Sequence, residues 1–236
     1  MITESEQKKM EESGKRMEHK GAAAEITPKV KIKICGLRRR EDILAVNAVL
    51  LDYCGFIIEF PKSFRSVTGD QVRELVRGLD PRICPVGVFV NAPEERVAEL
   101  LNEGTIAMAQ LHGQEDETYI RRLRALTDRP LIRAFSVKTA DDVQRAQASS
   151  ADFILLDQGG GGTGIPFDWS LVPRFSRPFF LAGGLGEDNL AEAIQRLKPY
   201  AVDLSSSVET DRWKDPEKIR RVVEIVKKAA VLDKNL

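Results

Sequence analysis

Eight short apolar runs recur along the chain, each separated from the next by a longer segment. The runs are mostly continuous and do not alternate strictly between apolar and polar positions, which is typical of strands buried on both faces of a parallel sheet. They cover residues 30–34, 54–58, 85–90, 107–111, 131–135, 153–157, 179–182 and 201–205. The pattern therefore predicts parallel strands at these positions.

The segments between the runs predict amphipathic helices. Apolar residues follow the i, i+3, i+4, i+7 spacing within residues 72–79, 190–197 and 219–226, which places them on one buried stripe of a helix. Thr139 and Asp142 have the spacing of a capping box at the start of a further helix. Strand and helix are therefore expected to alternate.

This alternation favours closure into one (β/α)8 barrel, and 236 residues suit a single domain of this kind. An open, doubly wound sheet shares the alternation and is the alternative fold. Its usual dinucleotide signature, G-x-G-x-x-G after the first strand, is missing from residues 35–42. We therefore predict a barrel over residues 29–236, with its chemistry where strands end and the following loops begin.

The first 28 residues stand apart from this pattern. They are rich in Glu, Lys, Gln and Ala, contain few apolar anchors, and end at Pro28 just before the first run. Such a composition buries too little apolar surface to offset the entropy lost on ordering. We predict that residues 1–28 form an N-terminal extension, either disordered or a frayed helix.

Charge and cysteine usage narrow the classes of function. Lys plus Arg and Asp plus Glu each number 36, so no overall basic field is available to attract nucleic acid or anionic lipid. No stretch suits a membrane span or a secretory signal, which predicts a cytoplasmic protein. The three cysteines lack C-x-x-C spacing and only two histidines occur, so neither a disulfide framework nor a metal cage is expected.

Glycines and serines gather after the last three predicted strands. An isolated pair of glycines is commonly just a tight turn, but several such loops side by side suit a phosphate site, because bare backbone brings N–H groups against phosphate oxygens. Barrels often bind phosphate at the loops after their seventh and eighth strands. The candidate phosphate-binding residues are Gly162, Gly164, Gly183, Gly184, Ser205 and Ser206.

Two residues at strand ends are candidates for proton transfer. Cys35 follows the first run directly and precedes Gly36, which places its thiol at the rim of the barrel. Cys54 and Cys84 lie near strand starts and are assigned to packing. Asp157 ends the run FILLD, where a carboxylate must either pair with a cation or take a raised pKa.

His112 and Arg65 lie in loops that follow predicted strands. His112 either joins strand to loop or contributes to the site. Arg65 is either solvated or binds a planar anion, for which a guanidinium group is the best side-chain partner. The residues alone leave these alternatives open.

Segments at the predicted loop positions form an ordered series. In chain order they are KIKICGL, PKSFRSV, VGVFVN, AQLHGQED, LLDQGGGGTGIPFDW, LAGGL and DLSSSVE. Taken together they closely resemble the phosphoribosylanthranilate isomerase family of tryptophan biosynthesis. The resemblance covers nearly the whole chain after Val30 and leaves out the N-terminal extension.

The resemblance implies an Amadori rearrangement of N-(5′-phosphoribosyl)anthranilate to 1-(2-carboxyphenylamino)-1-deoxyribulose 5-phosphate, with no metal or cofactor. By similarity, Asp157 is the general acid that protonates the ring oxygen, and Cys35 is the general base that takes the proton from sugar C2. Arg65 is implied to hold the anthranilate carboxylate, and His112 is counted with the substrate-binding residues. The partner is thus a small phosphorylated sugar, while the oligomeric state, monomer or homodimer, stays open.

The chain departs from the commoner family pattern at a few positions. The segment 55–65 is one residue longer, Phe64 replaces a frequent proline, and Ser207 stands where a glycine is usual. The side chain of Ser207 either crowds a bound phosphate or donates a hydrogen bond to it, and we expect phosphate binding to be retained.

Two alternative functions follow from the same residues. A phosphate-binding barrel of another specificity, such as a relative of indole-glycerol-phosphate synthase, would need lysine and glutamate at strand ends, but Lys31 and Lys33 precede the rim. A non-catalytic metabolite-binding barrel would keep the glycines without needing both Cys35 and Asp157.

Overall fold

The computed structural model describes residues 30–158, 168–172 and 175–232. The predicted extension, residues 1–28, lies outside the described residues, as do Gly162 and Gly164. The strands of the main sheet are β1 (Lys31–Cys35), β2 (Tyr53–Ile58), β3 (Ser66–Val67), β4 (Cys84–Phe89), β5 (Met108–Leu111), β6 (Leu131–Ser136), β7 (Phe153–Asp157), β8 (Phe179–Leu181) and β9 (Ala201–Leu204). Each predicted run coincides with one of these strands to within about one residue at either end.

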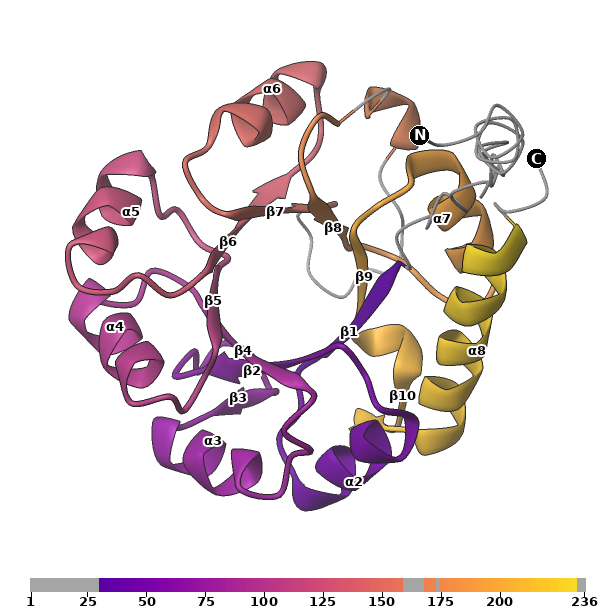
Figure 1. The fold of residues 1–236 in the computed structure, drawn as a ribbon, viewed down its shortest axis with the longest axis horizontal. Helices are drawn as coiled ribbons and strands as arrows, with labels where there is room; N and C mark the ends of the chain where they lie inside the picture. Colours follow the sequence, from indigo (N-terminus) through magenta and orange to yellow (C-terminus); the bar gives the residue numbers. More distant parts are fainter. Residues whose placement is uncertain (1–29, 159–167, 173–174, 233–236) are drawn as a thin grey trace, which may run out of the picture.

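The strands pair in parallel in the order β1-β9-β8-β7-β6-β5-β4-β2, and a further pairing of β1 with β2 closes the barrel. Figure 1 looks along this barrel, with the strands as an inner ring and the helices around it. The short strand β3 is added beside β2. Closure leaves the eight barrel strands without a free edge, as the predicted (β/α)8 fold requires.

Helices connect the strands across the outside of the barrel (Figure 1). They are α2 (Arg40–Val49), α3 (Gly69–Val76), α4 (Glu94–Asn102), α5 (Glu117–Arg124), α6 (Ala140–Ala148), α7 (Leu190–Leu197) and α8 (Pro216–Leu232). Between β7 and β8 the described residues form only a 3-10 helix, η1 (Trp169–Leu171). A second 3-10 helix, η2 (Ser206–Val208), and a small hairpin of β10 (Glu209–Thr210) and β11 (Trp213–Lys214) follow β9.

The helix boundaries follow local signals in the sequence. The predicted capping box at α6 is confirmed: Thr139 Oγ1 accepts from the N–H of Asp142, and Asp142 Oδ2 accepts from the N–H of Thr139 at 2.8 Å. The predicted helix over residues 72–79 was too long, because α3 ends at Val76 and a turn follows in which the Leu79 N–H bonds to the Val76 carbonyl. Leu79 still packs against the core from that turn.

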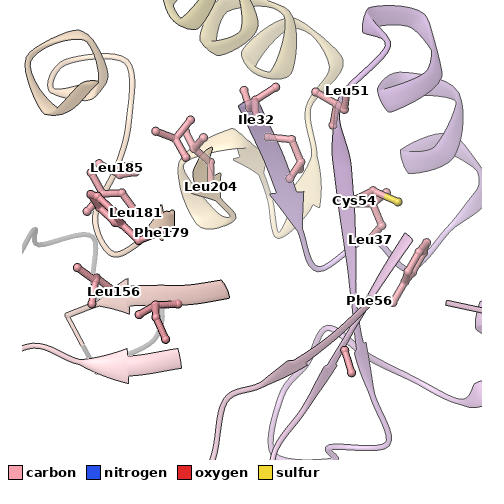
Figure 2. Close-up of a cluster of buried hydrophobic side chains, with 14 of the residues drawn as sticks. Ile32, Leu37, Leu51, Cys54, Phe56, Leu156, Phe179, Leu181, Leu185 and Leu204 are labelled. Carbon is pink, nitrogen blue, oxygen red and sulfur yellow. The ribbon is translucent and has the colours of Figure 1, made fainter. Parts of the chain in front are cut away.

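Outward side chains of the barrel strands form one apolar cluster, and apolar inward side chains form a second one. The outer cluster, part of which Figure 2 shows, contains Ile32 of β1, Leu156 of β7 and Leu204 of β9 and packs between barrel and helices. The inner cluster contains Leu155 of β7 and Phe180 of β8, one residue out of phase with the outer one. Period-two alternation therefore turns residues 33 and 35 of β1, 157 of β7 and 203 of β9 toward the inside of the barrel.

No helix in the part of the chain that the structure describes is long and apolar enough to cross a membrane.

Candidate active site

A cavity of about 680 Å³ lies at the carboxyl ends of the barrel strands. Its lining includes each predicted site residue that falls within the described ranges. These are Cys35, Arg65, His112, Asp157, Gly183, Gly184, Ser205 and Ser206. Residues from β1, β2, β5, β7, β8 and β9 and their loops thus meet in one place, although they are spread over most of the chain.

The Cys35 thiol enters this cavity from the last position of β1. The residue is 8% exposed, and it lies opposite Gly55 of β2 in the strand register. A Cβ at position 55 would lie 2.8 Å from Cys35 Sγ and 3.0 Å from Lys33 Nζ, so only glycine leaves room for both groups. Burial raises the pKa of the Cys35 thiol, while the ammonium groups of Lys33 and Lys214 act in the opposite direction.

A buried ion pair lies directly beneath this thiol. Lys33 Nζ is 2.7 Å from Asp203 Oδ2, and the Lys33 side chain is fully enclosed. Burial by itself lowers the pKa of Lys33, but Asp203 and Cys35 together outweigh burial and raise that pKa overall. Burial raises the pKa of Asp203, and Lys33 opposes the rise. The close contact is what allows opposite charges to persist in the interior.

Asp157 ends β7, and each of its two carboxylate oxygens lies near a different group. Its Oδ1 accepts a hydrogen bond of 2.7 Å from the N–H of Gln158, and its Oδ2 lies 3.4 Å from His112 Nε2. On the far side of the imidazole, His112 Nδ1 lies 2.9 Å from the amide nitrogen of the buried Gln110. A carboxamide can donate or accept once its two ends are exchanged, so Gln110 suits either imidazole tautomer.

The loop after β8 brings bare backbone against Asp157. Gly183 and Gly184 have φ values of +83° and +64°, in the left-handed region where glycine is favoured. A Cβ on Gly183 would lie 2.6 Å from Asp157 Oδ1. Asn189 holds the loop by accepting from the Gly186 N–H and donating to the Gly184 carbonyl.

The loop after β9 completes the same side of the cavity. Ser205 donates a 3.0 Å hydrogen bond from its hydroxyl to the Cys35 carbonyl, which ties β9 to β1 at the rim. Ser206 starts the 3-10 helix η2 and is exposed at the mouth. Ser207 lines the cavity, and its hydroxyl oxygen is buried with no hydrogen-bond partner among the described residues.

Arg65 is held in place by a bidentate ion pair with Glu209. Its Nε and Nη2 atoms each donate to the Glu209 carboxylate over 2.7 Å. Lys214 binds the same carboxylate at 2.7 Å and also donates to the Ser205 carbonyl. Although burial alone raises the pKa of Glu209, Arg65 and Lys214 lower it overall. Arg65 is therefore not simply solvated, which was one of its two interpretations from the sequence.

Lys33, Asp203, Gln110 and Glu209 were not predicted as site residues, and Lys33 was considered only as a lysine that precedes the rim. Polar residues at inward positions of otherwise apolar strands were a usable signal for the first three. Lys33 does precede the rim as expected, but it lies in the next inward position below Cys35. Glu209 lies in the hairpin after β9, a place that strand-end reasoning does not reach.

The described residues include no group of three or more His, Cys, Asp or Glu side chains arranged to hold a metal ion. What the cavity does offer is a thiol, a carboxyl group with a nearby imidazole, and a wall of glycine and serine backbone. These groups can move protons and enclose an anion. Fold and cavity together define the chain as a (β/α)8 barrel of the enzyme type, with its site at the carboxyl ends of the strands.

Comparison with known proteins identifies the family. The family model for N-(5′-phosphoribosyl)anthranilate isomerase matches residues 32–225. The chain is 45% identical over 201 residues to the N-(5′-phosphoribosyl)anthranilate isomerase of Endomicrobium trichonymphae, covering 84% of this chain and 98% of that relative. The chain belongs to the N-(5′-phosphoribosyl)anthranilate isomerase family, as the sequence motifs predicted.

Solved structures agree with this assignment. The phosphoribosyl anthranilate isomerase of Thermus thermophilus superposes with a TM-score of 0.76 at 30% identity, covering 84% of this chain and 99% of that one. Another phosphoribosyl anthranilate isomerase, solved in complex with reduced 1-(o-carboxyphenylamino)-1-deoxyribulose 5-phosphate, gives a TM-score of 0.74 at 32% identity with the same coverage. The predicted fold class is thereby confirmed.

Proposed function

We propose that this chain isomerises N-(5′-phosphoribosyl)anthranilate to 1-(2-carboxyphenylamino)-1-deoxyribulose 5-phosphate. The observation that carries the proposal is the meeting of the Cys35 thiol and the Asp157 carboxyl group in one cavity, beside a glycine- and serine-rich rim, in a member of this family. Both catalytic roles, and the binding roles below, are part of the proposal.

Asp157 acts first, as the general acid. In its protonated form it donates to the ribose ring oxygen, the bond between C1 and that oxygen breaks, and its electron pair stays on the oxygen. The anilino nitrogen lone pair then forms the iminium with C1. The 3.4 Å distance between His112 Nε2 and Asp157 Oδ2 supports a role for His112 in returning the proton that Asp157 gives up.

Cys35 acts second, as the general base. Its thiolate takes the proton from C2, and the C–H electron pair forms the C1–C2 double bond while the iminium electrons return to nitrogen. The resulting enolamine becomes the ketone when C1 takes up a proton and the C2 hydroxyl loses one. Substrate and product are isomers, so acid and base must both be restored within each turnover.

The remaining residues bind the two anionic ends of the substrate. The backbone of Gly183 and Gly184, with Ser205 and Ser206, forms the rim that receives the phosphate, a position where barrels bind this group without a net positive charge. Arg65 binds the anthranilate carboxylate. Glu209 takes the N–H of Nε and one N–H of Nη2, so the guanidinium binds that carboxylate through Nη1 and the second N–H of Nη2.

Growth of a tryptophan auxotroph that lacks this isomerase tests the function directly. The chain should restore growth, and a non-catalytic binder could not. With purified protein, loss of anthranilate-type fluorescence from substrate generated in place measures the rate. Cys35→Ala and Asp157→Asn should each lower kcat by about 10² to 10⁴-fold, the usual contribution of a general acid or base.

Cys84→Ala is the matched control for the cysteine variant, because Cys84 begins β4 at the opposite end of the barrel strands from the site. It should retain activity close to that of the wild type. If Cys35→Ala and Cys84→Ala turn over substrate at the same rate, Cys35 is not the base.

We also propose that the enzyme works in the cytoplasm. Its three cysteines are free thiols, a state that reducing compartments maintain.

A further inference from the structure

The ion pair of Lys33 and Asp203 has no part in the proton transfers described above. It joins β1 to β9 inside the barrel, with Lys33 fully enclosed and Asp203 8% exposed. The residues are 170 positions apart, so only the closure of the barrel brings them together.

Stability alone does not account for this pair. Removing two charges from water costs several kcal/mol per ion, and replacing a buried ion pair with apolar residues of similar volume is often neutral or stabilising. The inner cluster of the same barrel is filled by apolar and aromatic side chains such as Phe180 and Ala201. Inward positions can therefore be packed without charge, and a charged pair in the layer next to Cys35 points to a role in chemistry.

The geometry directs the ammonium toward the thiol. Lys33 precedes Cys35 by two residues, so both side chains leave β1 on the same face. The absent Cβ of Gly55 leaves a space that both atoms border, because a Cβ there would lie 2.8 Å from Cys35 Sγ and 3.0 Å from Lys33 Nζ. Asp203 Oδ2 accepts a 2.7 Å hydrogen bond from the Lys33 ammonium, while Asp203 Oδ1 is buried without a partner among the described residues.

We propose that Lys33 is a positioning residue that stabilises Cys35 as a thiolate, and that Asp203 holds the Lys33 ammonium in place and moderates its charge. The inference rests on the proposed function only where it calls the thiolate the base. The electrostatic coupling of the three side chains can be measured without any substrate.

Other ionisable groups near Cys35 also influence the pKa of its thiol. Lys214, from β11, favours the thiolate, and Asp203, from β9, opposes it. Cys54, on β2, is a buried neighbouring thiol that interacts with Cys35. Lys33 is distinguished from Lys214 because its Nζ borders the same space at Gly55 as the sulfur, whereas Lys214 is bound to Glu209 and Ser205.

The test is the pH dependence of iodoacetamide alkylation at Cys35 in the full chain, followed by mass spectrometry of the peptide that contains it. Lys33→Met should raise the thiol pKa by about one to three pH units, the usual effect of losing a nearby opposite charge. Asp203→Asn should lower the thiol pKa, because it leaves the ammonium uncompensated. The double variant contains neither charge, so its thiol pKa should lie above that of Asp203→Asn, and it guards against misfolding caused by one unpaired buried charge.

Lys31→Met is the matched control. Lys31 lies on the same face of β1, but its Nζ bonds to the Tyr200 hydroxyl at 2.8 Å in the next layer down. Its removal should leave the alkylation profile of Cys35 unchanged. Circular dichroism and thermal unfolding establish that each variant is folded.

Thiol pKa shifts of opposite sign in Lys33→Met and Asp203→Asn support the proposal. If the pair were merely structural, removing either partner would shift the pKa of Cys35 in the same direction. Shifts of the same sign, or none, overturn it. The pH profile of kcat/KM then separates the two claims. If the thiol pKa shifts as expected but the limb of the profile assigned to the base does not move, the coupling stands and the role of Cys35 as base is wrong.

Discussion

Gly183→Ala is the sharpest test of how the fold positions the general acid. The residue has φ of +83°, and a Cβ there would lie 2.6 Å from Asp157 Oδ1 and 2.7 Å from the Gln158 nitrogen. Those two atoms are the acceptor and donor of the hydrogen bond that orients the Asp157 carboxyl group. The added methyl group would therefore intrude directly on that hydrogen bond.

Two costs combine in this variant. A left-handed conformation costs an alanine about 1 to 2 kcal/mol relative to glycine. Overpacking typically costs about 1 to 3 kcal/mol. The free energy of unfolding should fall by about 2 to 5 kcal/mol if the site stays rigid, and by less if Asp157 rotates away. Rotation would instead appear in catalysis, as a loss of up to about 10² to 10⁴-fold in kcat.

Gly104→Ala separates strain from contact. Gly104 has φ of +78°, but no atom beyond its chain neighbours lies within 4 Å of the position its Cβ would take. This control should lose about 1 to 2 kcal/mol of stability and keep the wild-type kcat. Urea unfolding measures the first quantity, and the fluorescence assay at a temperature where both variants are folded measures the second.

A double-mutant cycle makes the assignment specific to Asp157. In an Asp157→Asn background, Gly183→Ala should have little further effect on kcat, because the group it displaces has already lost its acidic proton. Gly183→Ala and Gly104→Ala with equal kcat values and equal losses of stability would refute the reasoning. So would full additivity with Asp157→Asn.

Two further predictions concern α6 and the phosphate rim. Hydrogen bonds from the Lys138 backbone and other groups lower the pKa of Asp142 to about 2. Its capping contribution should therefore be complete above its unfolded pKa of about 3.9 and be lost as pH falls through about 2. Asp142→Asn should reduce the free energy of unfolding by about 0.5 to 2 kcal/mol near neutral pH, and the difference from wild type should shrink in acid. A difference that is as large at about pH 2 as near neutral pH contradicts this. Ser207→Gly should bind a phosphate analogue with affinity close to wild type, and titration showing a gain of about tenfold or more would mean that the Ser207 side chain crowds the phosphate.

Local patterns were sufficient to predict the barrel. The strand runs, the capping box at Thr139 and the series of loop segments depend only on residues close together in the chain. Helix ends were less secure, since Leu79 keeps the helical spacing although α3 has ended at Val76. Apolar spacing reports which side chains are buried, and a buried turn after a helix satisfies the same spacing.

The candidate site was predictable where it depends on strand ends. Parallel strands in a closed barrel share one rim, so Cys35, Asp157 and Gly183 could be expected near each other before their distances were known. Gly183 both forms part of the proposed phosphate rim and lies against the Asp157 carboxyl group. The second of these roles could not be anticipated in the same way. Its contact with Asp157 depends on how β8 lies beside β7, which is a property of strand register.

The sequence by itself determined the order of elements, the face of each strand that turns inward and the residues at the rim, because period-two and 3.6-residue spacings are local. Only the tertiary structure decided which inward side chains meet. The pairing of Lys33 with Asp203 and that of Arg65 with Glu209 span 170 and 144 residues. Such contacts arise when β9 pairs with β1 and closes the barrel, and no short-range pattern specifies the register of that pairing.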